Sequence, residues 1–308
     1  MLFRIICVRL CAVIKMRNKL TGSIDLTIAV LIWGTTFVAQ SVGMNSIGPF
    51  TFQACRCLLA VLFLFAAIAV FERKNLKSYW KRWSNPKLWY SGILCGLALF
   101  AAASLQQVSL LNTDAGKAGF LTALYVVFVP IIGFFLGKKP PFTVVISIAL
   151  AVAGLYLLSC MGVSSIQPGD LMLLGSAVCF AVQITLVDNL GNSLDGLRLN
   201  FVQCLVVGIF STVTMFVTEQ PEISSIAASW FPIAYAGVLS MGVAYSLQIL
   251  GQQKIEPTAA SIIMSLESVI AVISGWLLLN ERMSNQELLG CALVFVAVIL
   301  SQIPVKHK

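Results

Sequence analysis

The stretches AVLIWG at residues 29–34 and SAVCFA at residues 176–181 lie 147 positions apart and share one pattern of apolar and small residues. The same shift aligns QACRCLLAV at 53–61 with NFVQCLVVG at 200–208. In later segments the shift falls to about 142–143, which still aligns the two halves from end to end. This agreement indicates that the chain is a diverged internal duplication.

The composition of the chain requires a lipid environment. Hydrophobic residues make up 59% of the 308 residues and charged residues only 10%, with a mean hydropathy of +0.94. A soluble domain carries roughly 25% charged residues, and a membrane-spanning helix needs about 20 mostly apolar residues. We therefore predict an all-α integral membrane protein with ten transmembrane helices, at residues 25–42, 49–71, 88–110, 114–136, 142–160, 169–188, 198–217, 229–250, 257–279 and 285–303.

The duplication divides these helices into two units of five, residues 25–160 and residues 169–303. A unit with an odd number of helices inserts the second time upside down, so we expect two inverted five-helix repeats that face each other across a central cleft. Residues 1–24 form an N-terminal cytoplasmic segment in this interpretation. Its first part, residues 1–15, is interpreted as a gene-start extension before Met16, with a short interfacial helix as the alternative.

Lysine and arginine in the connections between predicted helices set the orientation. With the N-terminus inside, 17 of the 20 basic residues fall in cytoplasmic segments, Arg282 lies outside, and Arg56 and Lys117 lie within spans. We therefore predict a multi-pass protein of the bacterial inner membrane with both termini cytoplasmic. The net charge of +8 then reflects membrane topology, which argues against a nucleic-acid partner.

Several kinds of chemistry are disfavoured by the residue types present. The only histidine is His307, and none of the nine cysteines belongs to a C-x-x-C pair. These two facts argue against a metal site and against Ser/His or Cys/His catalysis. Because no Walker A sequence is present either, we expect no bound cofactor and no ATP hydrolysis by this chain.

Three charged residues lie at least three residues from either end of a predicted helix, where a charge costs roughly 2.5–3.5 kcal/mol and therefore tends to face a wet cavity or a partner. Arg56 or Lys117 would attract a carboxylate on a substrate. Glu267 lies near the membrane midplane, where it would take up a proton for coupling or pair with an amino group. The structural alternatives are snorkelling of both cations to the outer headgroups and a buried ion pair or helix cap at Glu267.

Polar and aromatic residues in other helices are further substrate-binding candidates. Gln106 and Gln248 occupy equivalent positions of the repeat, although buried amides also serve as hydrogen bonds between helices. Pro130 removes a backbone hydrogen bond within the fourth helix, so it marks either a gating hinge or a static kink. Four aromatic residues would line the cavity or, alternatively, pack against helices and lipid: Trp33, Phe37, Tyr125 and Tyr245.

Three segments in order carry a family resemblance that covers the chain from Met16. The run AVLIWGTTFV in the first helix resembles the opening of EamA-type members of the drug/metabolite transporter superfamily. The run GKAGFLTALYVVFVP at 116–130 resembles the fourth helix of that family, and residues 244–290 resemble its eighth to tenth helices. The resemblance implies ten helices in two inverted repeats, a central substrate cavity and carrier-mediated, usually outward, movement of small metabolites. One departure is the sequence Leu266-Glu267-Ser268, where many members have a proline in the ninth helix.

The leading hypothesis is a secondary active transporter that exports a small polar metabolite, such as an amino acid or a derivative, by alternating access. Proton exchange or the substrate gradient would drive the movement. The nearest alternative is an importer of a sugar or nucleotide derivative. A membrane-embedded enzyme is disfavoured because acids are scattered and histidine is lacking in the membrane segments. A channel or a non-transporting subunit stays open, as does a homodimer.

Overall fold

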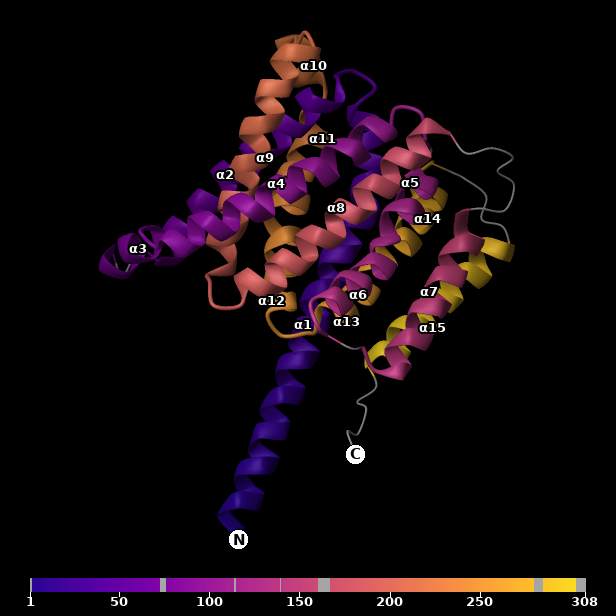
Figure 1. Cartoon of the computed structure of the whole chain (residues 1–308). Coiled ribbons are helices and arrows are strands. Elements are labelled where there is room, and N and C mark those ends of the chain that lie inside the picture. Colours follow the sequence, from indigo (N-terminus) through magenta and orange to yellow (C-terminus); the bar gives the residue numbers. More distant parts are fainter. Residues whose placement is uncertain are drawn as a thin grey trace.

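The computed structural model describes residues 2–72, 76–113, 115–138, 140–159, 167–279 and 285–302, and every regular element in these ranges is helical. Arg282 and His307 lie outside the described residues. The elements follow the chain in the order shown in Figure 1: α1 (Leu2–Gly43), α2 (Pro49–Glu72), α3 (Leu76–Trp83), α4 (Pro86–Ser109), α5 (Ala115–Ala123), α6 (Tyr125–Phe135), α7 (Phe142–Ser159), α8 (Pro168–Gly191), α9 (Gly196–Thr218), α10 (Ile223–Ala228), α11 (Trp230–Ala234), the π-helix η1 (Tyr235–Ala244), α12 (Tyr245–Gln252), α13 (Pro257–Met264), α14 (Leu266–Leu279) and α15 (Asn285–Gln302).

Proline and capping residues account for several helix starts. Pro86, Pro168 and Pro257 each occupy the first turn of a helix, where the missing N–H group has no intrahelical partner to lose. At the start of α4, the Asn85 side chain accepts a hydrogen bond from a backbone N–H at 3.1 Å. Asp195 does the same at the start of α9. These local signals begin the helices, and the apolar segments that follow extend them across the membrane.

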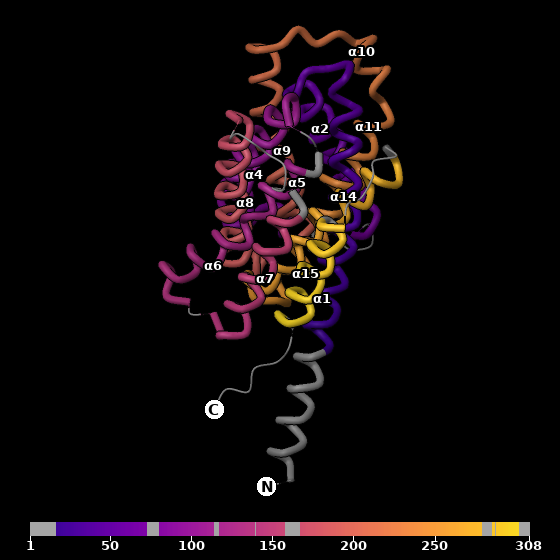
Figure 2. Tube along the Cα trace, turned by 90° about the vertical axis from the view of Figure 1, so that its right-hand side faces the viewer, coloured from indigo at the N-terminus to yellow at the C-terminus, as the bar shows by residue number. Residues whose placement is uncertain are grey.

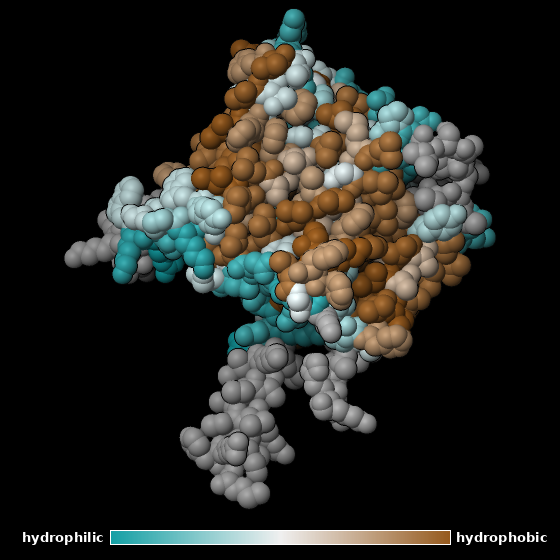
Figure 3. Space-filling model, viewed as in Figure 1, coloured by the Kyte–Doolittle hydropathy of each residue, from teal (hydrophilic) through white to brown (hydrophobic). Residues whose placement is uncertain are grey.

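Among the described residues, eight helical segments are long and apolar enough to cross a membrane. They coincide with eight of the ten predicted segments. The predicted fifth and tenth segments are the 18-residue helices α7 and α15, which are about 27 Å long at 1.5 Å per residue. Residues 160 and 303, which end those predicted segments, lie outside the described residues. Figure 3 shows a broad hydrophobic surface bordered by hydrophilic residues near α3 and at the lower ends of the helices.

The long helices pack in combinations that recur between the two halves. Helix α2 runs along α9, and α7 runs along α15. Helix α1 packs on α14, and α8 packs on α5 and α6. Helix α4 contacts both α8 and α9, while α12 and η1 contact α1, and η1 also contacts α2. Figures 1 and 2 show α7 and α15 lying side by side at one edge of the bundle.

Two predicted helices are interrupted, which the apolar pattern did not reveal. The predicted segment 114–136 contains α5 and α6 with a break at Leu124, and the predicted segment 257–279 contains α13 and α14 with a break at Ser265. At the second break, the Ser265 and Ser268 hydroxyls donate to backbone carbonyl oxygens three residues earlier, both at 2.7 Å. Such bonds compete with the helical pattern and bend helices. The two breaks fall at nearly equivalent positions of the duplication.

A glycine allows the closest approach between the two halves near the centre. A Cβ atom added to Gly34 of α1 would lie 2.9 Å from the carbonyl oxygen of Glu267 and would collide with the Ile270 side chain of α14. Overpacking of this kind typically costs about 1–3 kcal/mol. We predict that Gly34→Ala lowers the thermal unfolding midpoint of the detergent-purified protein.

The matched control is Gly133→Ala in α6, where the nearest atom to an added Cβ is 3.9 Å away. Alanine favours a helix interior by about 1 kcal/mol over glycine, so this variant should unfold at the wild-type temperature or slightly above it. Equal midpoints for the two variants would contradict the close packing of α1 on α14.

Candidate functional site

A buried cavity lies between the two halves of the chain and takes residues from both. Six predicted substrate-binding residues line it: Trp33, Arg56, Gln106, Tyr125, Gln248 and Glu267. The aromatic candidates Phe37 and Tyr245 line it as well. The sequence pattern had not indicated the other lining residues, namely Thr36, Gln40, Thr122, Phe180, Ile184, Ser240, Met241 and Met264.

Arg56 brings a positive charge into this cavity from α2. Its side chain is 3% exposed, its Nη1 donates to Gln40 Oε1 at 2.8 Å, and its guanidinium lies 5.7 Å from the centre of the Phe52 ring. These neighbours are neutral, and no ion pair joins Arg56 to an acid among the residues that the structure describes. The guanidinium is therefore oriented by Gln40 while its charge is left unbalanced.

Glu267 brings an ionisable carboxyl group from the first turn of α14. It is 6% exposed, and within the described ranges it too has no ion pair. The break at Ser265 places the N-terminus of α14 beside this carboxylate, where the helix dipole favours a negative charge. Tyr125 lies nearby at the start of α6, so the N-termini of two half-helices meet at the cavity.

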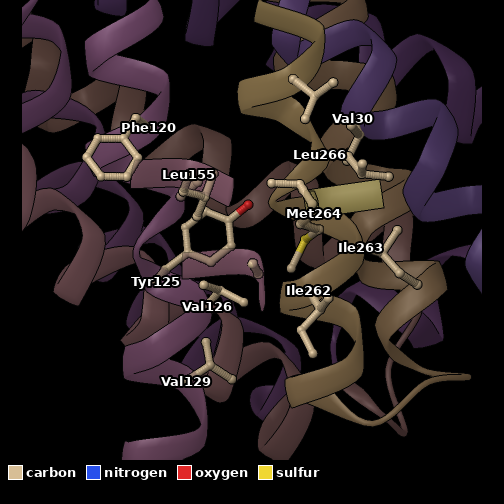
Figure 4. Packing of buried hydrophobic residues seen from close by; sticks show 14 of the residues in the cluster. Val30, Phe120, Tyr125, Val126, Val129, Leu155, Ile262, Ile263, Met264 and Leu266 are labelled. Carbon is tan, nitrogen blue, oxygen red and sulfur yellow. The ribbon is translucent and has the colours of Figure 1, made fainter. Parts of the chain in front are cut away.

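The Tyr125 side chain lies between α6 and the α13–α14 pair. Figure 4 shows its hydroxyl directed towards the side of Met264 and Leu266. The hydroxyl and Glu267 Oε1 are buried, and neither has a hydrogen-bond partner among the described residues. The two groups lie close enough to interact with each other, and each can also bond to a ligand or to water in the cavity.

The two equivalent glutamines both reach the cavity, but they have different partners. Gln106 Nε2 donates to Thr122 Oγ1 at 3.1 Å, within the first half. Gln248 Nε2 donates to Gln183 Oε1 at 3.1 Å, within the second half. The two positions are thus related by the duplication, while the groups that hold them are not.

Aromatic side chains form much of the remaining wall. The Trp33 and Tyr245 rings meet edge to face with centres 4.9 Å apart, and Tyr125 and Phe180 meet similarly at 6.5 Å. Trp33 Nε1 is buried without a partner among the described residues. The cavity thus combines flat apolar walls with a few convergent polar groups, which is typical of small-molecule sites.

Two predicted residues lie elsewhere. Lys117 Nζ is 2.8 Å from Asp170 Oδ2 in the first turn of α8, and Lys117 does not line the cavity. Asp170 was not predicted as its partner from the sequence, and this ion pair explains how the lysine is accommodated. Pro130 lies inside α6 and outside the cavity lining, whereas the break between α5 and α6 is at Leu124.

One missed residue had a usable signal in the sequence. Trp33, Phe37 and Gln40 recur at the spacing of one helix face, so a wall that contains the first two would include the third. Ser240 and Met241 had no such signal, because they lie in the π-helix η1, whose register differs from that of an α-helix.

The chain matches known transporters over nearly its whole length. It is 29% identical over 286 residues to an uncharacterized transporter of Archaeoglobus fulgidus, covering 92% of this chain and 86% of that protein. It is 24% identical over 298 residues to the uncharacterized transporter YoaV of Bacillus subtilis, covering 93% and 97%. A solved crystal structure at 17% identity superposes with a TM-score of 0.76, covering 91% of this chain and 96% of that one, so the fold is shared.

The profile of the EamA-like transporter family matches the chain twice, over residues 20–160 and 167–302. Each match takes in one copy of the duplicated pattern and one side of the cavity. The chain is therefore a multi-pass membrane protein that belongs to the EamA-like transporter family.

Proposed function

We propose that this protein is a secondary active transporter that exports a small polar metabolite, such as an amino acid or a derivative, by alternating access. The observation that carries the proposal is that two buried ionisable side chains without an ion pair, Arg56 and Glu267, line one cavity between the halves. A solute with a carboxylate and an ammonium group would neutralise both charges. We place the protein in a bacterial inner membrane with both termini cytoplasmic, as its basic residues favour.

The alternative substrates fit these charges less well. Arg56 is the only cation among the residues that line the cavity, and a nucleotide derivative would bring two or more negative charges to it. A neutral sugar would leave both Arg56 and Glu267 without an ionic partner, which is costly in a buried site. A zwitterionic solute meets neither difficulty.

The packing of the helices supports two inverted five-helix repeats, residues 25–160 and 169–303. The contacts of α1 with α14 correspond to those of α8 with α5 and α6 when the halves are exchanged, and α2–α9 and α7–α15 are each pairs of equivalent helices. The breaks in α5–α6 and α13–α14 correspond in the same way. In this arrangement α7 and α15 are the two further spans that complete the ten.

Two carboxylates at equivalent positions of the duplication each join one end of α2 to α9, and this arrangement supports alternating access. Glu219, at the end of α9, accepts from the backbone N–H groups of Phe50 and Thr51, both at 2.8 Å, at the start of α2. Glu72, at the end of α2, pairs with Arg198 near the start of α9, with Nη1 at 2.9 Å from Oε1. Glu72 and Glu219 are 147 positions apart, and so are Thr51 and Arg198. In the proposed topology these two contacts close opposite membrane faces of the α2–α9 pair.

The direct test is flux of a labelled amino-acid panel through proteoliposomes, with and without a pH gradient. Charge-assisted hydrogen bonds contribute about 1.5–3 kcal/mol, so Arg56→Gln should lower kcat/KM for carboxylate-bearing solutes by about tenfold or more. Glu267→Gln should abolish the response of flux to the pH gradient, because it removes the proposed proton-accepting group. Identical responses to the gradient in wild type and Glu267→Gln would contradict the coupling role.

The two carboxylate contacts give opposite expectations for access to the cavity. A cysteine at Ser240, in a chain whose native cysteines are replaced, would report labelling by a membrane-impermeant maleimide. Glu219→Gln weakens the outer contact and should speed labelling from outside severalfold, whereas Glu72→Gln should speed it from the cytoplasmic side in inverted vesicles. If both variants change labelling from the same side, the assignment of the contacts to opposite faces is wrong.

We assign Lys117 a structural role. Lys117→Met leaves Asp170 without its cation at a side chain that is 8% exposed, so the variant should lose about 1–3 kcal/mol of stability. The double variant Lys117→Met/Asp170→Asn should regain most of that loss and transport at a near wild-type rate per folded molecule. A double variant that is stable but inactive would indicate that Lys117 acts on the substrate.

A further inference from the structure

Gln248 has one end of its amide in use and the other end free. Its Nε2 donates to Gln183 Oε1 at 3.1 Å, while its Oε1 is buried at the cavity and has no hydrogen-bond partner among the described residues. The residue as a whole is 2% exposed. A buried amide oxygen without a hydrogen-bond donor costs free energy, so other contacts must hold the Gln248 amide in this orientation.

The hydrogen bonds continue from Gln183 through two further buried amides. Gln183 Nε2 donates to Gln203 Oε1 at 3.2 Å, and Gln203 Nε2 donates to Asn200 Oδ1 at 2.8 Å. All three of these residues are 0% exposed. We call Gln248, Gln183, Gln203 and Asn200 the amide chain.

The far end of the amide chain is anchored on the backbone of η1. Asn200 Nδ2 donates to the carbonyl oxygens of Met241 and Gly242 at 2.9 and 3.1 Å. A carbonyl oxygen only accepts hydrogen bonds, so the NH₂ group of Asn200 must face η1 and its Oδ1 must face away. The Asn200 amide, at this end of the amide chain, therefore has one permitted orientation.

The orientation of the Asn200 amide determines the orientations of the other three amides in the amide chain. Asn200 Oδ1 requires the NH₂ group of Gln203, whose oxygen then requires the NH₂ group of Gln183. The oxygen of Gln183 requires in turn the NH₂ group of Gln248. Reversing any one amide would set two oxygens or two NH₂ groups against each other in a buried site, at the cost of unsatisfied polar groups. Gln248 can then show only its oxygen to the cavity.

We propose that the amide chain fixes Gln248 as a hydrogen-bond acceptor that selects solutes with an N–H or O–H donor at that end. Its assignment to a transported solute rests on the proposed function. The acceptor shares the cavity with the Glu267 carboxylate, whereas Arg56 supplies donors, so the cavity offers acceptors for an ammonium group and donors for a carboxylate. Asn200, Gln203 and Gln183 are positioning residues, because they act on the solute only through Gln248.

The equivalent glutamine of the first half provides an internal comparison. Gln106 Nε2 donates to the Thr122 hydroxyl, and a hydroxyl can either accept or donate a hydrogen bond. Gln106 can therefore turn its amide over at little cost and present either group to the cavity. The duplication has produced one fixed acceptor and one adaptable amide at equivalent positions.

The orientation can be tested without knowing the substrate, by comparing Gln248→Glu with Gln106→Glu. Both substitutions are isosteric and place a carboxyl group in the same cavity, and the comparison is made at a pH at which that group is ionised. A carboxylate at 248 would face Gln183 Oε1 without a donor, whereas a carboxylate at 106 would accept from the Thr122 hydroxyl. We expect the apparent melting temperature of Gln248→Glu to lie about 3 °C or more below that of Gln106→Glu. Equal melting temperatures, or a lower value for Gln106→Glu, would overturn the fixed orientation.

A second variant, Asn200→Ala, removes the hydrogen bonds that anchor the amide chain on the backbone of η1. In an Asn200→Ala background the three glutamines are free to reverse, so that Gln183 can donate to a carboxylate at 248. The loss caused by Gln248→Glu should therefore be smaller in this background than in wild type, and the double variant should fold even if Gln248→Glu alone does not. An undiminished loss in the Asn200→Ala background would contradict control of Gln248 by the amide chain.

The selection of solutes is tested by comparing the transport of L-leucine with that of N,N,N-trimethyl-L-leucine, which has no N–H donor, in proteoliposomes. Wild type should prefer L-leucine, and Gln248→Leu should reduce that preference by about tenfold, more than Gln106→Leu does. An unchanged preference in Gln248→Leu would overturn the selective role. Failure of wild type to move L-leucine would contradict its assignment as a substrate under the proposed function, and the melting comparison would still decide the orientation of Gln248.

Discussion

The hydrocarbon core of a membrane offers no water to polar groups, and this constraint governs how the buried polar residues are arranged. Most of them are satisfied by other side chains or by backbone carbonyls, as the Ser176 hydroxyl is by the Ala102 carbonyl oxygen. Arg56 and Glu267 are the exceptions at the centre, because neither ionisable side chain has an ion pair within the described residues. A protein retains such a pair where a solute, water or a proton completes it.

The duplication supplies a scaffold that is symmetric in its helices and asymmetric in its chemistry. The helix breaks and the carboxylates that end α2 and α9, Glu72 and Glu219, lie at equivalent positions of the two halves, and α2 packs on its equivalent α9. The cavity charges do not recur, since Arg56 aligns with Gln203 and Glu267 aligns with Leu124. In the proposed mechanism, repeated helices would allow the halves to exchange conformations, whereas unmatched side chains would give the solute one preferred orientation.

The sequence predicts the long apolar helices well, because lipid imposes length and apolar composition on every helix that spans the membrane. It also predicts four charged or amide residues of the cavity, Arg56, Gln106, Gln248 and Glu267, because such a residue in an apolar helix seldom faces lipid. The break at Ser265 was missed, since hydroxyl bonds to the preceding turn leave the apolar pattern unchanged. The partner of Lys117 was missed because Asp170 lies on another helix, 53 positions away. The amide chain depends on distances between helices, which no pattern along one helix contains.

The central claim is that Arg56 and Glu267 recognise the two ends of one zwitterionic solute. The most direct measurement is the binding of L-leucine to the purified protein, compared with 4-methylpentanoate, which lacks the ammonium group, and 3-methylbutylamine, which lacks the carboxylate. Each truncated compound leaves one buried charge unpaired, so we predict that both bind at least tenfold more weakly than L-leucine. Equal affinity for all three compounds would contradict the claim.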